Sequence, residues 1–204
     1  MLSAALLALL SSYVDFEKKE INLKLVYFSA DEAVGNANLE YVYAKTNPDA
    51  GTTLRSERHA SGRYYAFLPL TLGEIRGFKT RFHLYTMGSA KAYEAGRRQV
   101  LKGVDGIVFI ADRSPKQSSV NVAALAQLKA DLAANAVAWG SVPVIYQAVG
   151  TGDLDATTKA LAVPADAKVF EADPAQGTGV FDTLKAAAKA MLMALRDQGR
   201  DGGR

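Results

Sequence analysis

The architecture of this chain follows from one stretch, RYYAFLPLTLGEIRGFKTRFHLYT (residues 63–86). Its two ends, RYYAFLPL (63–70) and FKTRFHLYT (78–86), are rich in aromatic and other strand-forming residues and predict two strands. The short linker TLGEIRG contains two glycines, which favours a hairpin. Because side chains alternate along a strand, the second strand presents one core face and one polar face. The core face carries Phe78, Thr80, Phe82 and Leu84, and the other carries Lys79, Arg81, His83 and Tyr85.

Strands and helices alternate along the rest of the chain. Further strands are predicted at 21–28, 103–112, 142–149 and 167–172, and helices at 36–46, 90–101, 119–139, 157–163 and 179–198. A parallel connection needs a crossover helix, so the pattern predicts an α/β fold. We expect a mostly parallel six-stranded sheet with one antiparallel hairpin strand and helices on both faces. In such folds ligands bind at the carboxyl ends of the strands.

The composition restricts the chemistry. The chain has 204 residues, 49% of them hydrophobic, which suits one domain with its own core. It has no cysteine and only two histidines, which excludes disulfides and thiolate metal sites and leaves no metal site to predict. The net charge of +3 is too small to indicate nucleic acid, so we expect no nucleic-acid partner.

The chain begins with an uncharged apolar run, MLSAALLALLSSYV (1–14). No Lys or Arg precedes its leucines, as would be usual in a signal peptide, and the run is too short to span a bilayer. Leucine spacing predicts a helix that packs on its own domain, although contact with a membrane or a partner through residues 1–14 stays open. We expect a helical extension over 1–16, a domain over 17–198, a polar tail over 199–204, and a cytoplasmic protein.

Three segments carry a family resemblance. FLPLTLGEIRGFKTRFHLYT (67–86), VLKGVDGIVFIADRS (100–114) and GTGVFDTLKA (177–186) resemble the MglA family of bacterial Ras-like GTPases, and the similarity runs from about residue 20 to 195. The resemblance implies a Ras-like P-loop NTPase fold that binds GTP or GDP with Mg²⁺ and switches between two nucleotide states. It also implies a role in cell polarity and gliding motility, with the Roadblock-domain protein MglB as partner.

The first phosphate loop departs from the family pattern. Such a loop reads G-x-x-x-x-G-K-[ST], whose backbone N–H groups surround the phosphates. In this chain Ser29 and Val34 occupy the positions of the two motif glycines. Gly35 occupies the position of the lysine, and Asn36 that of the residue whose hydroxyl binds Mg²⁺.

Two acidic residues also lie in this loop. Asp31 and Glu32 add negative charge where a phosphate would bind, and like charges a few ångströms apart repel. We therefore expect the pocket around residues 29–36 to be filled.

The later loops depart from the pattern too. Ser89 occupies the position of the family's glycine that contacts the γ-phosphate, and Ala90 occupies that of the glutamine that orients the attacking water. Ser61 occupies the position of the catalytic arginine. Arg58 and Arg63 lie nearby in the sequence.

The loop after the strand at 142–149 lacks the guanine-reading N-K-x-D motif. Val149 and Gly150 stand in its place, and Asp153 reaches the Asp position only with a one-residue insertion.

These replacements lead to the hypothesis of a catalytically inactive pseudo-GTPase, which is not an enzyme and has no cofactor, and which acts by binding protein. A Roadblock-domain protein or an active MglA-type GTPase is the expected partner, through the switch and hairpin surface formed by Tyr64, Tyr65, Arg76, Phe78, Lys79 and Arg81. The alternative is a divergent GTP/GDP-binding small GTPase that uses Arg58, Arg63, Lys91 or Lys102 for phosphate.

Overall fold

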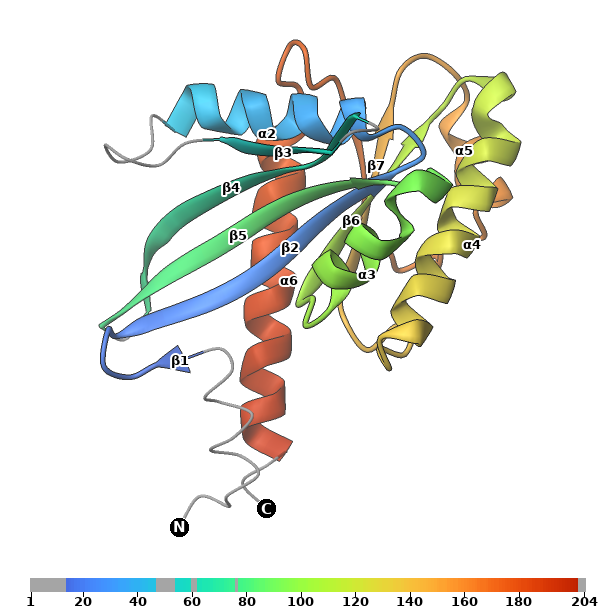
Figure 1. Ribbon diagram of the computed structural model, residues 1–204. Helices are drawn as coiled ribbons and strands as arrows, with labels where there is room; N and C mark the ends of the chain where they lie inside the picture. The colour runs from blue at the N-terminus through green and yellow to red at the C-terminus, as the bar shows by residue number, and fades with distance from the viewer. Residues whose placement is uncertain (1–13, 47–53, 60–61, 76, 202–204) are drawn as a thin grey trace.

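The structure is a computed structural model that describes residues 14–46, 54–59, 62–75 and 77–201. An eight-stranded sheet forms its centre, with the order β3-β4-β5-β2-β6-β7-β8 and β1 paired to β2 (Figure 1). The strands are β1 (Val14–Asp15), β2 (Glu20–Ser29), β3 (Arg55–His59), β4 (Gly62–Ile75), β5 (Phe78–Gly88), β6 (Gly106–Asp112), β7 (Val144–Val149) and β8 (Val169–Ala172). The predicted α/β class is confirmed.

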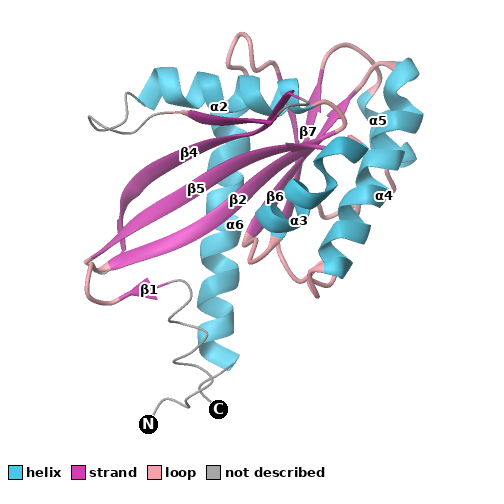
Figure 2. Ribbon diagram, viewed as in Figure 1, coloured by secondary structure: helices cyan, strands magenta, loops and turns pink. Residues whose placement is uncertain are grey.

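Helices cover both faces of the sheet (Figure 2). The α-helices are α2 (Glu32–Thr46), α3 (Glu94–Leu101), α4 (Ser118–Ala134), α5 (Leu154–Ala160) and α6 (Val180–Asp201), and two 3-10 turns, η1 (Lys91–Tyr93) and η2 (Pro115–Gln117), precede α3 and α4. Residues of α2 and α6 pack into one buried cluster and residues of α3 and α4 into another. The sheet therefore separates two cores.

The hairpin agrees with its predicted pairing. β4 and β5 run antiparallel, with Leu70 opposite Phe82, while β5 runs parallel to β2. Thr80, Phe82 and Leu84 are buried, whereas Lys79 and Arg81 are exposed. The alternation predicted for this strand is confirmed.

Two strands were not expected. β3 pairs antiparallel with β4, and β1 pairs antiparallel with the start of β2. β1 brings the end of the predicted extension, residues 14–15, into the sheet. Residues 1–13 of that extension and residues 202–204 of the tail lie outside the described residues.

A helix that spans a membrane needs about 20 predominantly apolar residues. Within the described ranges, no helix is both long enough and apolar enough to cross a membrane.

Candidate functional site

The carboxyl ends of the parallel strands enclose a small cavity. Its volume is about 80 Å³, and it lies between the turn after β2 and the segment after β6. The lining includes Ser29, Asp31, Val34, Asp112 and Asn121. A cavity of this size is smaller than the several hundred Å³ of a small-molecule site, so the predicted pocket is largely filled.

Asp31 caps the helix that begins at this cavity. β2 ends at Ser29 and α2 begins at Glu32, so the turn between them is short. The Asp31 carboxylate accepts a hydrogen bond from the Ala33 N–H at 3.0 Å, and the Ser29 hydroxyl donates to the Asp31 carbonyl at 2.6 Å. A helix N-terminus attracts anions, and here the chain's own carboxylate takes that place.

Glu32 is directed towards the segment that follows β5. Its carboxylate accepts a hydrogen bond from the Tyr93 hydroxyl at 2.9 Å. A Cβ atom on Gly88 would lie 2.7 Å from the other Glu32 carboxylate oxygen, so a larger residue at 88 would displace this side chain. Of the two acidic residues, Asp31 lines the cavity and Glu32 belongs to the contact between α2 and the segment after β5.

Gly35 and Asn36 pack α2 against β5. A Cβ atom on Gly35 would lie 3.2 Å from the Thr86 side chain, which leaves little room for a larger residue. Thr86 donates a hydrogen bond to the Asn36 side-chain oxygen at 2.6 Å and accepts one from the Ala66 N–H at 2.8 Å. In this conformation both positions serve helix packing, and neither offers the lysine or hydroxyl of the family pattern.

A buried amide cluster lies beneath the site, and sequence reasoning missed it. Asn38 of α2 and Gln147 of β7 exchange two side-chain hydrogen bonds of 2.9 and 3.0 Å, and Gln147 also donates to the Thr183 hydroxyl of α6 at 3.1 Å. All three side chains are fully buried. The one available signal was a glutamine inside an otherwise apolar strand.

The segment after β5 is held from below by Arg97. The Ser89 N–H donates to the Ser29 carbonyl at 3.0 Å, which joins this segment to the turn after β2. Arg97 donates to the Ala90 carbonyl at 2.6 Å and pairs with Asp131 of α4 at 2.6 Å, and both charged groups are buried. Arg97, held in place by this ion pair, thereby fixes the backbone at Ala90.

Asp153 caps α5 by accepting hydrogen bonds from two backbone N–H groups, at 2.9 and 3.2 Å. Arg113 donates to the Gly150 carbonyl and pairs with Glu171. These contacts link the carboxyl ends of β6, β7 and β8. A Cβ atom on Gly152 would lie 2.1 Å from the Arg113 carbonyl, so this approach requires glycine. Sequence reasoning missed Arg113. Val149, which stands in place of the guanine-reading motif, lines the cavity.

The hairpin surface is described only in part. Lys79 and Arg81 lie on the exposed face, and Arg81 pairs with Glu20 at 3.3 Å. Phe78 packs edge-on against Phe16 with ring centroids 5.8 Å apart. Ser61 and Arg76 lie outside the described residues, as do the side chains of Tyr64 and Tyr65. The partner role of these residues stays a prediction.

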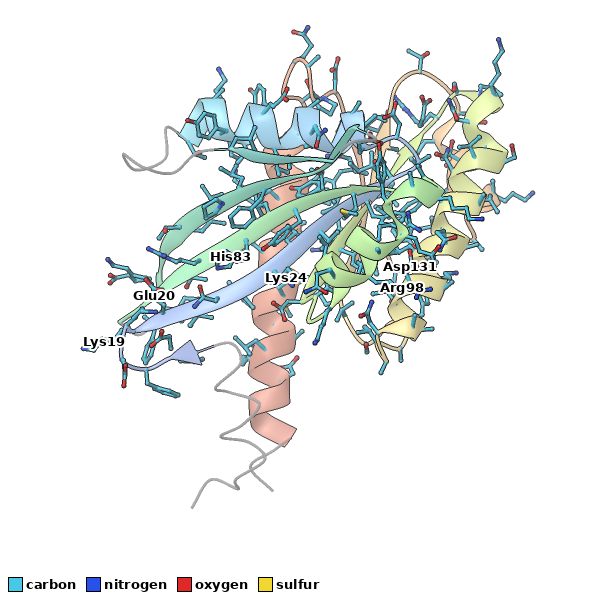
Figure 3. All side chains as sticks on the ribbon, viewed as in Figure 1. Lys19, Glu20, Lys24, His83, Arg98 and Asp131 are labelled. Carbon is cyan, nitrogen blue, oxygen red and sulfur yellow. The ribbon has the colours of Figure 1, made fainter. Side chains whose placement is uncertain are left out.

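His83 lies on the same exposed side of the sheet. Its imidazole Nε2 is 2.9 Å from the Asn22 side-chain oxygen, and its ring stacks on Phe67. Burial, together with the charges of Arg81 and Lys24, lowers the pKa of His83 below its ordinary value of 6.5, although Glu20 opposes this. Figure 3 shows His83 and Lys24 on the central strands, away from Asp131. His83 is therefore a hydrogen-bonded histidine of the sheet.

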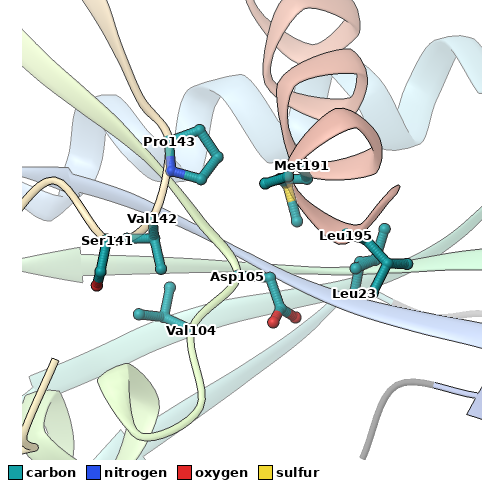
Figure 4. A pocket seen from close by; sticks show the side chains of 9 residues that line it. Leu23, Val104, Asp105, Ser141, Val142, Pro143, Met191 and Leu195 are labelled. Atoms are coloured by element: carbon teal, nitrogen blue, oxygen red, sulfur yellow. The ribbon is translucent and has the colours of Figure 1, made fainter. Parts of the chain in front are cut away.

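A second pocket lies at the opposite end of the parallel strands from the cavity. Figure 4 shows it between Met191 and Leu195 of α6 and Asp105, which precedes β6. Its volume of about 30 Å³ holds about one water molecule. Because it lies at the amino ends of the parallel strands, it is not the ligand site of this fold.

The residues at the carboxyl edge fit the family's ligands only partly. No group of three or more His, Asp or Glu side chains in the described ranges could hold a metal by itself. The first phosphate loop, capped by Asp31, does not present the phosphate contacts that the resemblance implies.

Comparison with known proteins settles the family. No protein-family model matches the chain. The chain is 37% identical to the mutual gliding-motility protein MglA of Myxococcus xanthus (strain DK1622) over 198 residues, which cover 92% of this chain and all of that protein. It belongs to the MglA family of bacterial Ras-like GTPases. The Ras-like fold inferred from the hairpin and the later segments is therefore confirmed.

Membership of the MglA family contradicts two expectations from the loops. The chain was expected not to be an enzyme, yet the family is one of GTPases. It was expected to have no cofactor, yet the family implies GTP or GDP and Mg²⁺. Those expectations treated each family residue as indispensable. Backbone N–H groups and cations from neighbouring loops also bind phosphate, so substitutions in the loops do not establish the loss of activity.

Proposed function

We propose that this MglA-type chain is a divergent small GTPase that binds GTP and GDP with phosphate contacts unlike those of the family pattern. The observation that carries the proposal is the 37% identity to MglA over 92% of the chain. The fold supports it, because the loops after β2, β5, β6 and β7 meet at the carboxyl edge, where doubly wound sheets bind nucleotides.

Basic residues around the carboxyl edge would supply the phosphate contacts. Lys91 begins the turn after β5 and Lys116 lies in the turn after β6, and both are exposed. Lys102 is unsuitable, because it lies at the amino ends of the parallel strands, where its carbonyl accepts a hydrogen bond from the Lys24 ammonium group. The side chains of Arg58 and Arg63 lie outside the described residues. Lys91 and Lys116 are therefore the candidates.

Two carboxylates would hold Mg²⁺. Asp31 and Asp112 both line the cavity at the carboxyl edge. Magnesium is usually bound by one or two carboxylates together with substrate phosphates and water, which suits a site with two. The ion would supply positive charge against the phosphates, while Asp31 and Asp112 orient it.

The proposal extends to partner, process and place. A protein partner fits the exposed basic face with Lys79 and Arg81 on the hairpin, and a Roadblock-domain protein is the candidate from the family resemblance. Gliding motility is the process that the name of the Myxococcus relative indicates. Since GTP is a cytoplasmic nucleotide, we propose that the protein acts in the cytoplasm.

Release of inorganic phosphate tests the proposal. The purified chain is incubated with GTP or ATP and Mg²⁺, alone and with a Roadblock-domain protein from the same cell. We expect slow release from GTP, little from ATP, and faster release with the partner. The variants Lys91→Ala and Lys116→Ala should weaken GTP binding. Lys129→Ala is the control and should not, because Lys129 lies on α4 with its ammonium group over the Trp139 ring. Equal release from GTP and ATP, or none from either, would reject the proposal.

A further inference from the structure

An apolar groove runs between the hairpin and the last helix. Its volume is about 470 Å³ and its surface is mostly apolar. Leu72 and Ile75 of β4 form one wall, and Leu192 and Met193 of α6 form the other. Leu72 and Met193 are 43% and 44% exposed, so both walls present apolar surface, and a contiguous exposed apolar patch marks an interaction site.

The groove uses a second face of α6. One face of this helix, with Leu184 and Met191, is buried against the sheet. The groove face carries Lys185, Ala188, Lys189, Leu192, Met193 and Arg196, which follow the i, i+3, i+4 spacing of one helical stripe. In Figure 1 the C-terminal half of α6 extends past the strands. The apolar residues of this face, Ala188, Leu192 and Met193, lie between basic residues whose charged groups can extend into water, so the apolar part is available to a covering segment.

A buried hydroxyl in the groove also lacks a partner. Thr80 lines the groove and is 1% exposed, and its Oγ1 has no hydrogen-bond partner within the described part of the chain. A buried hydroxyl without a hydrogen bond costs about 1–3 kcal/mol, so most are satisfied. Because this oxygen is itself inaccessible, an occupant would reach it only if the floor of the groove shifted, so the requirement on the occupant comes from the apolar surface of the groove.

We infer that residues 1–13 of this same chain occupy the groove. The segment MLSAALLALLSSY contains five leucines, three serines and no charged side chain, which matches an apolar groove. Its length also matches: 13 helical residues span roughly 20 Å, and the stripe from Lys185 to Arg196 spans roughly 17 Å. The inference concerns packing and does not depend on nucleotide binding.

The place where the described chain begins supports this occupant. Val14 pairs with Ile21 and packs on the same core cluster as Phe78, Leu192 and Leu195. Figure 3 places Lys19 and Glu20 at the end of the sheet where β1 lies, and the Lys79 N–H donates to the Lys19 carbonyl at 2.8 Å. The segment therefore starts beside the groove. A short tether gives it a millimolar effective concentration, which favours it over a second copy or a membrane.

Site-directed cross-linking tests this contact, because the chain has no cysteine of its own. Leu6→Cys is combined with Met193→Cys in the groove, or with Val122→Cys as the control, since Val122 is 42% exposed on α4 across the sheet. With a short bismaleimide at low protein concentration, we expect the groove pair to link within one chain about tenfold faster than the control pair.

A second variant keeps the test independent of cysteine placement. Adding Leu2→Asp and Leu9→Asp to the groove pair should reduce its cross-linking to the control rate, with circular dichroism confirming that the domain is folded. Equal rates for the two pairs would overturn the inference. Links formed only between two chains would assign the groove to a second copy. Binding of the segment to phosphatidylglycerol vesicles without any internal link would assign it to a membrane, and both results would overturn the inference.

Discussion

The charge of Asp31 affects how strongly an anion would bind at the start of α2. Its carboxylate caps the helix, and asparagine caps helices equally well but carries no charge. The variant Asp31→Asn should therefore keep α2 intact and remove one repulsive charge from the phosphate site. At high dielectric such a charge costs about 1 kcal/mol, so GTP measured with EDTA should bind roughly five- to tenfold more tightly.

The same variant should lose part of the gain in GTP affinity on adding Mg²⁺, because Asp31 is one of the two carboxylates proposed to hold the ion. Isothermal titration with and without Mg²⁺ measures both effects. Asp166→Asn, which removes an exposed carboxylate elsewhere, is the control and should change neither. Unchanged affinity in EDTA for Asp31→Asn would show that phosphate does not bind near this residue.

His83 should make folding stability depend on pH. Because burial and the nearby cations lower its pKa in the folded state, the unfolded chain binds the proton first as the pH falls. Its contribution is constant above its ordinary pKa of 6.5, and stability is lost as the pH falls from there to the lower folded pKa. Urea unfolding across this window should show a smaller loss for His83→Gln than for the parent chain, and parallel curves would contradict the assignment.

At the scale of elements, the buried Arg97–Asp131 pair ties α3, α4 and the segment after β5 together. Arg97→Leu leaves a buried carboxylate unpaired and should lower the free energy of unfolding by about 3–5 kcal/mol. Arg97→Leu with Asp131→Leu should lose less, because no charge stays buried. Denaturant unfolding measures both. The exposed neighbour Arg98, which pairs with Glu94 on the same helix, is the control, and Arg98→Leu should cost under about 1 kcal/mol.

The amide cluster joins three other elements. Gln147→Ala removes hydrogen bonds from Asn38 of α2 and Thr183 of α6 and leaves buried polar atoms unsatisfied. We expect a loss of about 2–4 kcal/mol in the free energy of unfolding, from unsatisfied groups and the cavity. Gln176→Ala, an exposed glutamine before α6, should have almost no effect. Similar losses for both variants would argue against the cluster as a structural link.

Most elements could be predicted from the sequence because their apolar periodicity is strong, as in the hairpin and α6. β3 could not, because RSERH has no apolar alternation and becomes a strand only by pairing with β4. α2 begins at Glu32, earlier than the apolar spacing from residue 36 indicated, because Asp31 caps it. β4 continues to Ile75 through an irregularity in register between Thr71 and Glu74, which alternation does not foresee.

The site was less predictable than the fold. The sequence located the loops at the carboxyl edge and the acidic Asp31 in the first of them. The roles of Arg97, Arg113 and Asn38 arise from partners 34, 58 and 109 residues away, and no local pattern reports such contacts. The loop sequences also predict an inactive chain without cofactor, and this prediction is wrong, because phosphate contacts do not depend on the family residues alone.

At the scale of the whole molecule, the fold combines an MglA-type framework with a carboxyl edge closed by its own side chains. Asp31, Glu32 and Arg113 all make internal contacts there. Nucleotide binding would require this edge to open, so the bound and free proteins should differ in the loops after β2 and β6. A GTPase of this kind would bind its ligand more weakly than one with an open phosphate loop, because opening uses part of the binding free energy.

Direct titration of the full chain with fluorescent GDP and GTP, each with and without Mg²⁺ and with ATP as the competitor, tests the central claim most directly. The account predicts saturable binding of both guanine nucleotides in the micromolar range, tighter with Mg²⁺ and displaced by unlabelled GTP but not by ATP. No saturable binding of either nucleotide to protein that circular dichroism shows to be folded would contradict it.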